Sequence, residues 1–352
     1  MKAVISPGPS YSDPNVKLHA GWFATFGSYQ EALEELGYDV HMLEVDPQVV
    51  DRTCTVSQEL SYDVAAYYEL LTRGWLDEVD LFLGSTGYSI TQMAALRKAK
   101  KIVWTWNNAD WFRDQQLIEE YKRFNFPYDT SPAWRLINRI ALETCDHVIA
   151  TTTHIGETLT RLIPHEKISI VPKGVDCEKF SPMWEKDTGT FKVLFSATDI
   201  IRKGFAYLIE AVRDMKGVEI WSVGPSPLYD PPDYIRQFDM VPFADVQKIY
   251  RQCDIFCMPT LEDGFSNALH EAMACGVVPI TTPVISEAFQ HKVSGLEVGY
   301  RDIAGIRASI RYLQESPDVM EKMGKEARLQ AEKCSWDVAK ERLKEVVREV
   351  TS

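Results

Sequence analysis

The chain has 352 residues, with 51 acidic against 38 basic residues and a formal net charge of -13 at pH 7. This length suits two domains better than one, and a hydrophobic content of 45% is enough for each to bury a core. The acidic balance argues against general nucleic-acid binding, because neutralising phosphates requires a basic face.

Short apolar runs alternate with longer amphipathic segments along the chain, a pattern typical of a parallel sheet covered by helices on both faces. We therefore predict an α/β fold. In the first half the predicted strands are, in chain order, 2–6, 39–44, 80–84, 101–106, 147–151 and 168–171. The pattern restarts in the second half with predicted strands at 192–196, 218–223, 254–259 and 277–281. Because the pattern restarts, we expect two separate sheets.

The periodicity lapses near residue 180. Ser181-Pro182 and the polar stretch 185–190 contain turn formers that suit an exposed linker, so we place the hinge at about 180 to 190. The predicted domains are 1–180 and 181–335. A final helix is expected from Trp336 onward, with Ser335 as its N-cap and 336–352 as a separate C-terminal segment.

The seven cysteines are odd in number and lack the paired spacing of a zinc site, so we interpret them as reduced core residues. The first predicted strand begins at Lys2, and no apolar run approaches the roughly 18 residues that span a bilayer. These features favour a cytoplasmic protein. The basic run 97–101 leaves open a peripheral contact with an anionic membrane surface.

Segment 259–276 follows a predicted strand and opens a helix. In an open α/β sheet, ligands bind beyond the carboxyl ends of strands, and a helix N-terminus offers free N–H groups to a phosphate. Gly264 lets the backbone approach a ligand closely, and Ser266 can cap the helix or bond a phosphate oxygen. The segment therefore predicts an anion-binding site.

Two carboxylates accompany this site. Asp263 lies just before the helix, and Glu271 lies one turn after Asn267 with its side chain tilted back towards the N-terminus. Carboxylates suit the hydroxyls of a ribose and a sugar, since each accepts two hydrogen bonds from a diol. The combination points to a nucleotide sugar. The alternative is that Asp263 and Ser266 only cap the helix and that Glu271 is a surface residue.

Segment 195–205 follows the first strand of the second half and precedes a helix, which places it at a carboxyl strand end as well. Its Arg202 and Lys203 supply the positive charge that a pyrophosphate leaving group needs. The alternative is a solvated basic pair at the start of a helix.

These segments together resemble family 4 of the retaining glycosyltransferases, over nearly the whole chain. The signature of that family is an acid, seven residues and then Glu, and Asp263 and Glu271 stand at this spacing, with Glu-Ala-Met-Ala-Cys-Gly at 271–276. Residues 171–176 and 180–182 look like the interdomain junction of the family, and 202–204 looks like its phosphate-binding Arg-Lys-Gly.

Two further matches lie nearer the chain ends. Gly21, with Ala20, aligns with the paired glycines of an N-terminal loop that faces the diphosphate. The final helix after Ser335 resembles the helix that returns to the N-terminal domain. The resemblance implies the GT-B architecture, which has two Rossmann-like domains, a deep interdomain cleft and a returning C-terminal helix. It assigns acceptor binding to 1–180 and nucleotide-sugar binding to 181–335.

By the same resemblance, Glu271 would hold the ribose and Asp263 the donor-sugar hydroxyls, with Arg202 and Lys203 on the diphosphate. The backbone around Val241 is similar to the strand edge that reads the base. The amide cradle of the donor would be formed by Gly264, Phe265 and Ser266, followed by Asn267.

Three departures from the family pattern stand out. The first signature acid is Asp263 rather than Glu, so Glu262 could assist. The arginine expected before Arg-Lys-Gly is absent at Ala197-Thr198. A histidine expected after the fourth strand is absent too, so acceptor or donor-sugar chemistry in that loop would have to use Asn107, Asn108 or Asp110.

The expected reaction is transfer with retention by front-face displacement, in which the leaving diphosphate helps deprotonate the acceptor. The donor would be a UDP-sugar before a GDP-sugar, and the acceptor a glycan, lipid-linked or small-molecule hydroxyl. No cofactor and no metal are expected, and His270 is interpreted as a packing residue. Rival hypotheses are an epimerase or phosphorylase on the same fold and a non-catalytic nucleotide-sugar-binding subunit. The oligomeric state stays open.

Overall fold

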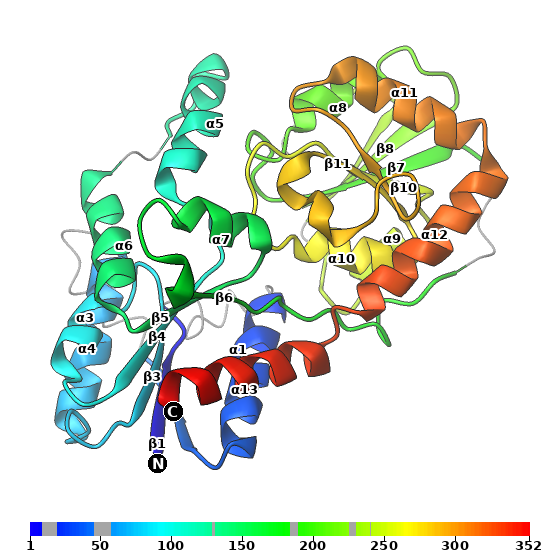
Figure 1. Cartoon of the computed structure of the whole chain (residues 1–352). Coiled ribbons are helices and arrows are strands. Elements are labelled where there is room, and N and C mark those ends of the chain that lie inside the picture. The colour runs from blue at the N-terminus through cyan, green and yellow to red at the C-terminus, as the bar shows by residue number, and fades with distance from the viewer. Residues whose placement is uncertain (9–19, 46–57, 129–130, 184–188, 225–229, 240) are drawn as a thin grey trace. The chain divides into compact units, whose positions relative to one another are not determined.

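The computed structural model describes residues 1–8, 20–45, 58–128, 131–183, 189–224, 230–239 and 241–352. The chain forms two compact units (Figure 1). Unit 1 consists of Met1–Asp110, Asp129–Gly174 and Trp336–Ser352, and unit 2 of Trp111–Tyr128 and Val175–Ser335. Each unit is described by itself below.

Unit 1 contains a six-stranded parallel sheet in the order β2-β1-β3-β4-β5-β6. Its strands are β1 Lys2–Ser6, β2 Asp39–Met42, β3 Leu81–Ser85, β4 Lys100–Thr105, β5 His147–Ala150 and β6 Ile168–Ile170. Its helices are α1 Ala20–Glu35, α3 Gln58–Thr72, α4 Ile90–Ala95, α6 Pro132–Thr144, α7 Thr153–Leu159, the 3-10 turn η3 His165–Lys167 and α13 Trp336–Thr351. Figure 1 shows α1 and α13 on one side of this sheet and α3 and α4 on the other.

The core of unit 1 is built on three aromatic rings. Phe26 and Tyr29 of α1 each meet Trp104 of β4 edge to face, at centroid distances of 5.4 and 6.1 Å. Leu343 and Val346 of α13 pack into the same cluster. The last helix therefore buries its apolar face against α1, far from it in sequence (Figure 1).

Unit 2 contains a second six-stranded parallel sheet, in the order β12-β11-β10-β7-β8-β9. Its strands are β7 Phe191–Ser196, β8 Val218–Val223, β9 Ile235–Phe238, β10 Ile255–Met258, β11 Val278–Thr281 and β12 Leu296–Glu297. Its helices are α5 Asp110–Arg123, whose first residue belongs to unit 1, α8 Phe205–Val212, α9 Val246–Tyr250, α10 Asn267–Ala274, η4 Pro283–Ala288, α11 Ile303–Gln314 and α12 Pro317–Glu332. In Figure 1, α8 and α11 cover one face of the sheet and α10 and α12 the other.

All ten predicted strands are confirmed within two residues at either end, and so are the α/β class and the two separate sheets. The sequence prediction missed β9 and β12. In β9 two of the four residues are Arg236 and Gln237, which lowers its apolar signal, and β12 has only two residues. Both lie at the edges of the sheet, where one side needs no partner strand.

The division between the units falls after Gly174, earlier than the expected hinge at 180 to 190. Val175 pairs with Ser335 in a short parallel bridge. Arg328 of α12 donates to the carbonyls of Phe180 (2.5 Å) and Cys177 (2.9 Å), so the chain after 174 is already fastened to unit 2. The polar stretch 185–190 that suggested the hinge follows this point in the sequence, and its residues 185–188 lie outside the described residues.

Residues 111–128 were expected in the N-terminal domain but group with unit 2. Leu117 of α5 is fully buried in the hydrophobic core of that unit. Glu120 is buried as well, and it accepts hydrogen bonds from Tyr207 (2.5 Å) and Arg301 (3.0 Å). These contacts fix α5 to unit 2 through one buried face.

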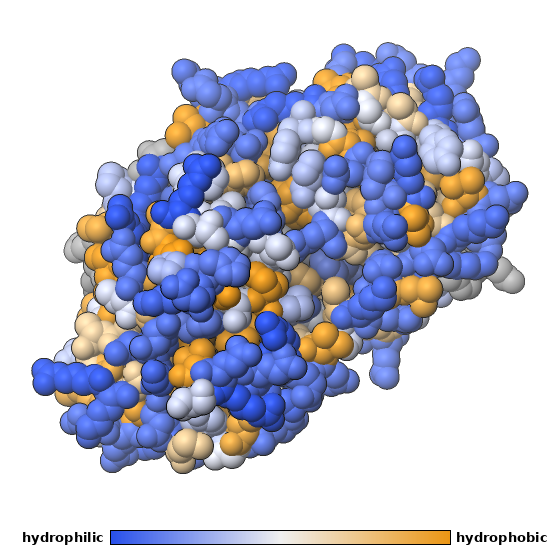
Figure 2. All heavy atoms as spheres, in the orientation of Figure 1, coloured by the Kyte–Doolittle hydropathy of each residue, from blue (hydrophilic) through white to orange (hydrophobic). Residues whose placement is uncertain are grey.

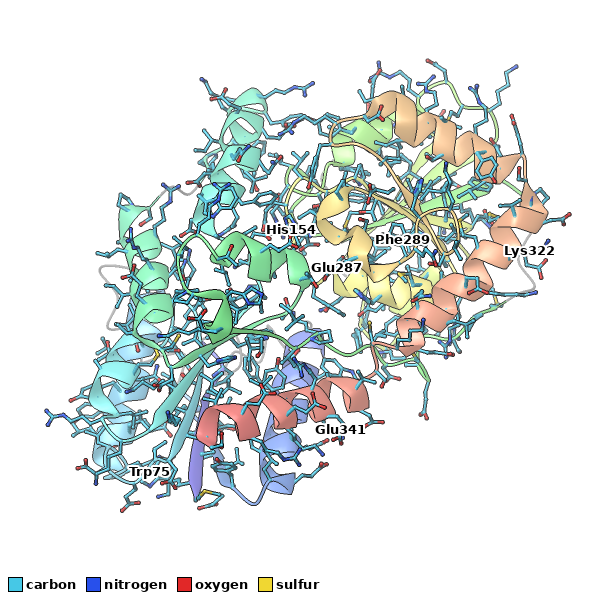
Figure 3. All side chains as sticks on the ribbon, viewed as in Figure 1. Trp75, His154, Glu287, Phe289, Lys322 and Glu341 are labelled. Atoms are coloured by element: carbon cyan, nitrogen blue, oxygen red, sulfur yellow. The ribbon has the colours of Figure 1, made fainter. Side chains whose placement is uncertain are left out.

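Figure 2 shows hydrophilic residues over most of the face in view, with smaller hydrophobic areas between them. In Figure 3, Lys322 on α12 and Glu341 on α13 point outward, whereas Phe289 points into unit 2. Within the described parts of the chain, every helix is too short or too polar to cross a bilayer. The same parts contain no cluster of three or more His, Cys, Asp or Glu residues arranged to hold a metal ion.

Candidate functional site

The sheet of unit 2 has a topological switch point between β7 and β10. From β7 the chain runs outward through β8 and β9, and from β10 it runs the other way through β11 and β12. All these strands are parallel, so the loops after β7 and β10 emerge side by side at the same edge of the sheet. This is the position where open α/β sheets bind ligands, and both motifs singled out in the sequence lie on these loops.

The two loops are held together by their backbones. The amide of Leu261 donates to the carbonyl of Arg202 (2.9 Å), and the hydroxyl of Thr260 donates to the same carbonyl (3.2 Å). Gly204 makes this approach possible, since it has a φ of 72° and a Cβ there would lie 2.1 Å from the carbonyl oxygen of Pro259. Only glycine fits this position without displacing the loop.

Four charged side chains meet between the loops. Lys203 forms an ion pair with Asp263, and both are buried. Nη1 of Arg202 contacts Oδ1 of Asp263 at 3.5 Å and Oε2 of Glu262 at 3.3 Å, and the Glu262 side chain is fully buried. Three of the four predicted catalytic residues are therefore in direct contact, joined by Glu262.

The charges of this cluster stabilise one another. Burial disfavours the charge of Arg202, but the carboxylates of Glu262 and Asp263 outweigh it and raise the pKa of the guanidinium. Burial would raise the pKa of Asp263, yet Lys203 and Arg202 hold it below its usual range. Burial and the neighbouring Arg202 lower the pKa of Lys203 to about 8. At neutral pH both cations of the cluster are therefore charged, and both are paired with carboxylates.

Helix α10 begins directly after this cluster. Ser266 is its N-cap, and its side chain accepts from the amide of Leu269 (3.4 Å). His270 lies in the buried interior, with Nδ1 2.8 Å from the carbonyl of Ser266 and its ring stacked on Phe265 at 3.8 Å. His270 thus has the packing role expected of it, and it fixes Phe265 at the mouth of the helix.

Glu271 belongs to a second group, one helical turn further along α10. Burial raises the pKa of its carboxyl to about 7, partly offset by the positive charge of Lys179. The ammonium of Lys179 lies over the ring of Phe243, 3.0 Å from its centroid. Tyr250 lies near Glu271 and donates to Ser196, the last residue of β7 (2.7 Å). This group also sits at the carboxyl end of β7.

The other predicted donor residues fall in both units. Asn267 is the first residue of α10, and Val241 follows β9 and packs against the core of unit 2. Gly21 lies in the first turn of α1, in unit 1. These residues keep their assignments as predictions.

The predicted acceptor loop follows β4 in unit 1. Asn107 is partly buried and its carbonyl accepts from the Thr105 hydroxyl (3.3 Å), whereas Asn108 is buried. Asp110 is the first residue of α5. The loop therefore lies at the carboxyl edge of the sheet of unit 1, which is the edge where such loops bind ligands.

Sequence reasoning missed four residues near the site. Asp199 lies within segment 195–205 but was given no role, and Lys179 lies between the two segments interpreted as the interdomain junction. Arg113 and Tyr121 lie on α5, and only the fold brings them to the loop after β7. The sequence offered one indication that Lys179 could lie near the site, because this residue directly precedes the Phe-Ser-Pro junction at 180–182. No spacing rule linked it to Glu271.

Two parallel six-stranded sheets, each wrapped by helices, define the fold class as GT-B, and the unit 2 site lies at the carboxyl edge of the second sheet. The model described as Glycosyltransferase Family 4 matches residues 28–179, and the one described as Glycosyl transferases group 1 matches residues 190–316. Together the matches cover well over half of the chain. The chain belongs to this family of glycosyltransferases.

Curated proteins related to this chain share less than 30% sequence identity with it over the matched regions. A D-inositol 3-phosphate glycosyltransferase from Pseudarthrobacter chlorophenolicus is 23% identical over 226 residues, 56% of this chain and 52% of the relative. The putative colanic acid biosynthesis glycosyltransferase WcaL of Escherichia coli K12 is 29% identical over 140 residues, 34% of each chain. The matched region spans about half the length of the first relative and a third of the second.

Solved structures match nearly the whole chain. Sucrose-phosphate synthase from Thermosynechococcus elongatus superposes with a TM-score of 0.76 at 15% identity, covering 99% of both chains. Anabaena HepE in complex with UDP superposes with a TM-score of 0.68 at 13% identity, covering 99% of this chain and 100% of HepE. At these identities the likeness establishes the shared fold.

Proposed function

We propose that this protein transfers a sugar from a nucleoside diphosphate to a hydroxyl group, with retention at the anomeric carbon. UDP is the favoured nucleotide and GDP the next, and the acceptor is a glycan, a lipid-linked sugar or a small molecule. The observation that carries the proposal is the cluster of the partly buried Arg202 with the buried Lys203 and Asp263 at the switch point of unit 2, beside the N-terminus of α10.

Each group at this edge has a chemical task in the proposed reaction. Arg202 and Lys203 stabilise the charge that develops on the departing diphosphate, together with the N–H groups at the start of α10. The Asp263 carboxylate accepts hydrogen bonds from donor-sugar hydroxyls, and that of Glu271 from the ribose diol. These roles are the ones that the resemblance of the sequence motifs implied for the same residues.

The bond changes are simple. The bond between the anomeric carbon and the β-phosphate oxygen breaks, and a bond to the acceptor oxygen forms on the same face of the sugar. The acceptor proton passes to the departing diphosphate. Arg202, Lys203 and the helix N-terminus supply positive charge to the phosphates, so we propose that transfer needs no metal ion.

The relatives support a nucleotide donor. HepE, whose fold this chain shares over 99% of its length, has been solved with UDP and also with UDP-glucose. A pneumococcal O-GlcNAc transferase with UDP and GlcNAc superposes as well, with a TM-score of 0.60 over 81% of this chain. These ligands are named for those proteins, and we extend the nucleotide to this chain on the strength of the Arg202-Lys203 cluster.

Turnover with a panel of UDP-, GDP- and ADP-sugars, in the presence of EDTA, tests the proposal. We expect transfer to an added glycan acceptor, or slow hydrolysis without one, with product retaining the anomeric configuration by NMR. Conversion of the nucleotide sugar to an epimer would contradict the proposal. So would a requirement for free phosphate, or tight UDP binding without any turnover.

The raised pKa of Glu271 predicts an acid limb in the pH profile of donor affinity, that is, a fall in affinity as the pH is lowered. Below about pH 7 the carboxyl is protonated and accepts fewer hydrogen bonds from the ribose, so UDP-glucose affinity should fall by up to about tenfold per pH unit. Above about pH 8 Lys203 loses its proton, so the affinity should fall again. Calorimetric titrations from pH 5.5 to 9 should therefore give a maximum between 7 and 8.

The control for this profile is Glu271→Gln, which keeps the size of the side chain and removes its titration. The acid limb should flatten while the fall above pH 8 remains. UDP-glucose is the appropriate ligand because it lacks a phosphate monoester, which titrates near pH 6. An acid limb that persists unchanged in Glu271→Gln would assign it to another group.

A further inference from the structure

Helix α5 presents one continuous face to unit 2. Arg113, Leu117, Glu120 and Tyr121 follow the spacing i, i+4, i+7, i+8, which places them on the same side of a helix. Leu117 is fully buried, and Glu120 is anchored by Tyr207 and Arg301. The two remaining positions of this face, Arg113 and Tyr121, reach the phosphate-site loops.

Tyr121 hydrogen-bonds to Asp199, which is one of the carboxylate partners of Arg202. Its hydroxyl donates to Oδ2 of Asp199 at 2.5 Å. The same Oδ2 accepts from Nε of Arg202 at 3.3 Å, and Oδ1 of Asp199 accepts from the Arg202 backbone amide at 3.1 Å. Asp199 therefore holds both the backbone and the side chain of Arg202, and Tyr121 holds Asp199.

Arg113 forms an ion pair with Glu262, which is another carboxylate partner of Arg202. Its Nε lies 3.8 Å from Oε2 of Glu262. Nη1 of Arg202 lies 3.3 Å from that same oxygen. Two guanidinium groups therefore flank one oxygen of a fully buried carboxylate, and both contribute to neutralising its negative charge.

The charge count gives this arrangement a consequence for ligand binding. Arg202 and Lys203 face three carboxylates, those of Asp199, Glu262 and Asp263. Without a further cation, this cluster would carry a negative excess that repels a diphosphate. Arg113 supplies that cation. It stands more than eighty residues before the motif that it serves.

We propose that Arg113 and Tyr121 of α5 are positioning residues of the diphosphate site, each engaging one carboxylate partner of Arg202 so that its guanidinium is oriented towards the phosphates. This inference rests on the proposed function and deepens it. It adds a segment from the N-terminal half of the sequence to the donor site of unit 2.

The test compares the affinities of UDP and of uridine in the full-length protein. Arg113→Ala and Tyr121→Phe should each weaken UDP by about 3- to 10-fold, the range for one net hydrogen bond, while uridine, which has no phosphate, should change little. UDP is measured by calorimetry and uridine by ligand-observed NMR. The UDP-to-uridine affinity ratio is the readout, because general loosening of the fold would weaken both ligands alike.

Matched controls lie in the same unit. Lys122→Ala removes an exposed cation of α5 whose partner is Glu119 at 3.7 Å, and Tyr312→Phe removes the hydroxyl of an exposed tyrosine on α11. Both should leave the ratio unchanged. An unchanged ratio in Arg113→Ala and Tyr121→Phe, while the wild type binds UDP, would overturn the inference alone. Failure of the wild type to bind UDP or GDP would contradict the proposed function and, with it, this inference.

Discussion

Replacing Lys203 with methionine should weaken UDP-glucose binding by about 10- to 100-fold, because a charge-assisted hydrogen bond is worth roughly 1.5–3 kcal/mol. Methionine retains the apolar stem, so the change removes the charge and little packing. It also leaves the Asp263 carboxylate without its ion-pair partner Lys203, which adds repulsion to the lost attraction. Calorimetric titration gives the affinity, and circular dichroism verifies the fold.

A matched control for this variant is Lys248→Met in the same unit. Lys248 also pairs with an aspartate, Asp245 at 2.6 Å, but the pair is exposed and lies at the start of α9. Surface pairs of this kind contribute little, so the affinity should stay at the wild-type value. Equal losses in the two variants would mean that Lys203 has no specific role in the donor site.

Replacing Gly204 with alanine should destabilise the protein by about 3 kcal/mol or more. A left-handed φ of 72° costs an alanine roughly 1–2 kcal/mol, and the added Cβ at 2.1 Å from the Pro259 carbonyl oxygen forces the two loops apart. For a domain of this size the melting temperature should fall by roughly 6–12 °C. Because Arg202 and Lys203 lie on the displaced loop, UDP-glucose affinity should fall as well.

Gly217→Ala separates the two parts of this effect. Gly217 has a similar φ of 69°, but the nearest atom to an added Cβ is the Gln314 side-chain nitrogen at 3.8 Å. Only the backbone cost of roughly 1–2 kcal/mol applies there. Differential scanning calorimetry should therefore show a smaller shift for Gly217→Ala than for Gly204→Ala, with donor affinity intact. Equal shifts would exclude a role for the contact with Pro259.

Local sequence patterns predicted the strands well because most of them are buried on both faces and consist of uninterrupted apolar residues, as in β10, Ile255–Met258. The edge strand β9 carries Arg236 and Gln237 and gave no such signal. The domain boundary was harder to predict. Turn formers mark exposed chain, but the fastening of 175–183 by Arg328 and Arg251 depends on contacts with residues far along the sequence.

The residues of the candidate site likewise fall into those that local sequence predicted and those that depend on contacts between distant parts of the chain. Arg202, Lys203 and Asp263 were predicted together because each lies in the loop between a strand and the following helix, and a parallel sheet brings these loops to one edge. Arg113 and Tyr121 carry no comparable signal. They are ordinary residues of an amphipathic helix until the fold places that helix against unit 2. Local pattern therefore predicts the residues on the sheet edge, while residues that reach it from elsewhere appear only in three dimensions.

Amide hydrogen exchange of the full-length protein, with and without saturating UDP-glucose, tests the central claim most directly. If the donor binds at the switch point of unit 2, exchange should slow in the loop 199–204 and in 261–267, the two segments that carry the proposed donor site; the amide of Gly264 already donates to Oδ1 of Asp263 at 2.9 Å. Binding that leaves both segments unprotected while slowing exchange elsewhere would contradict the assignment of the donor site.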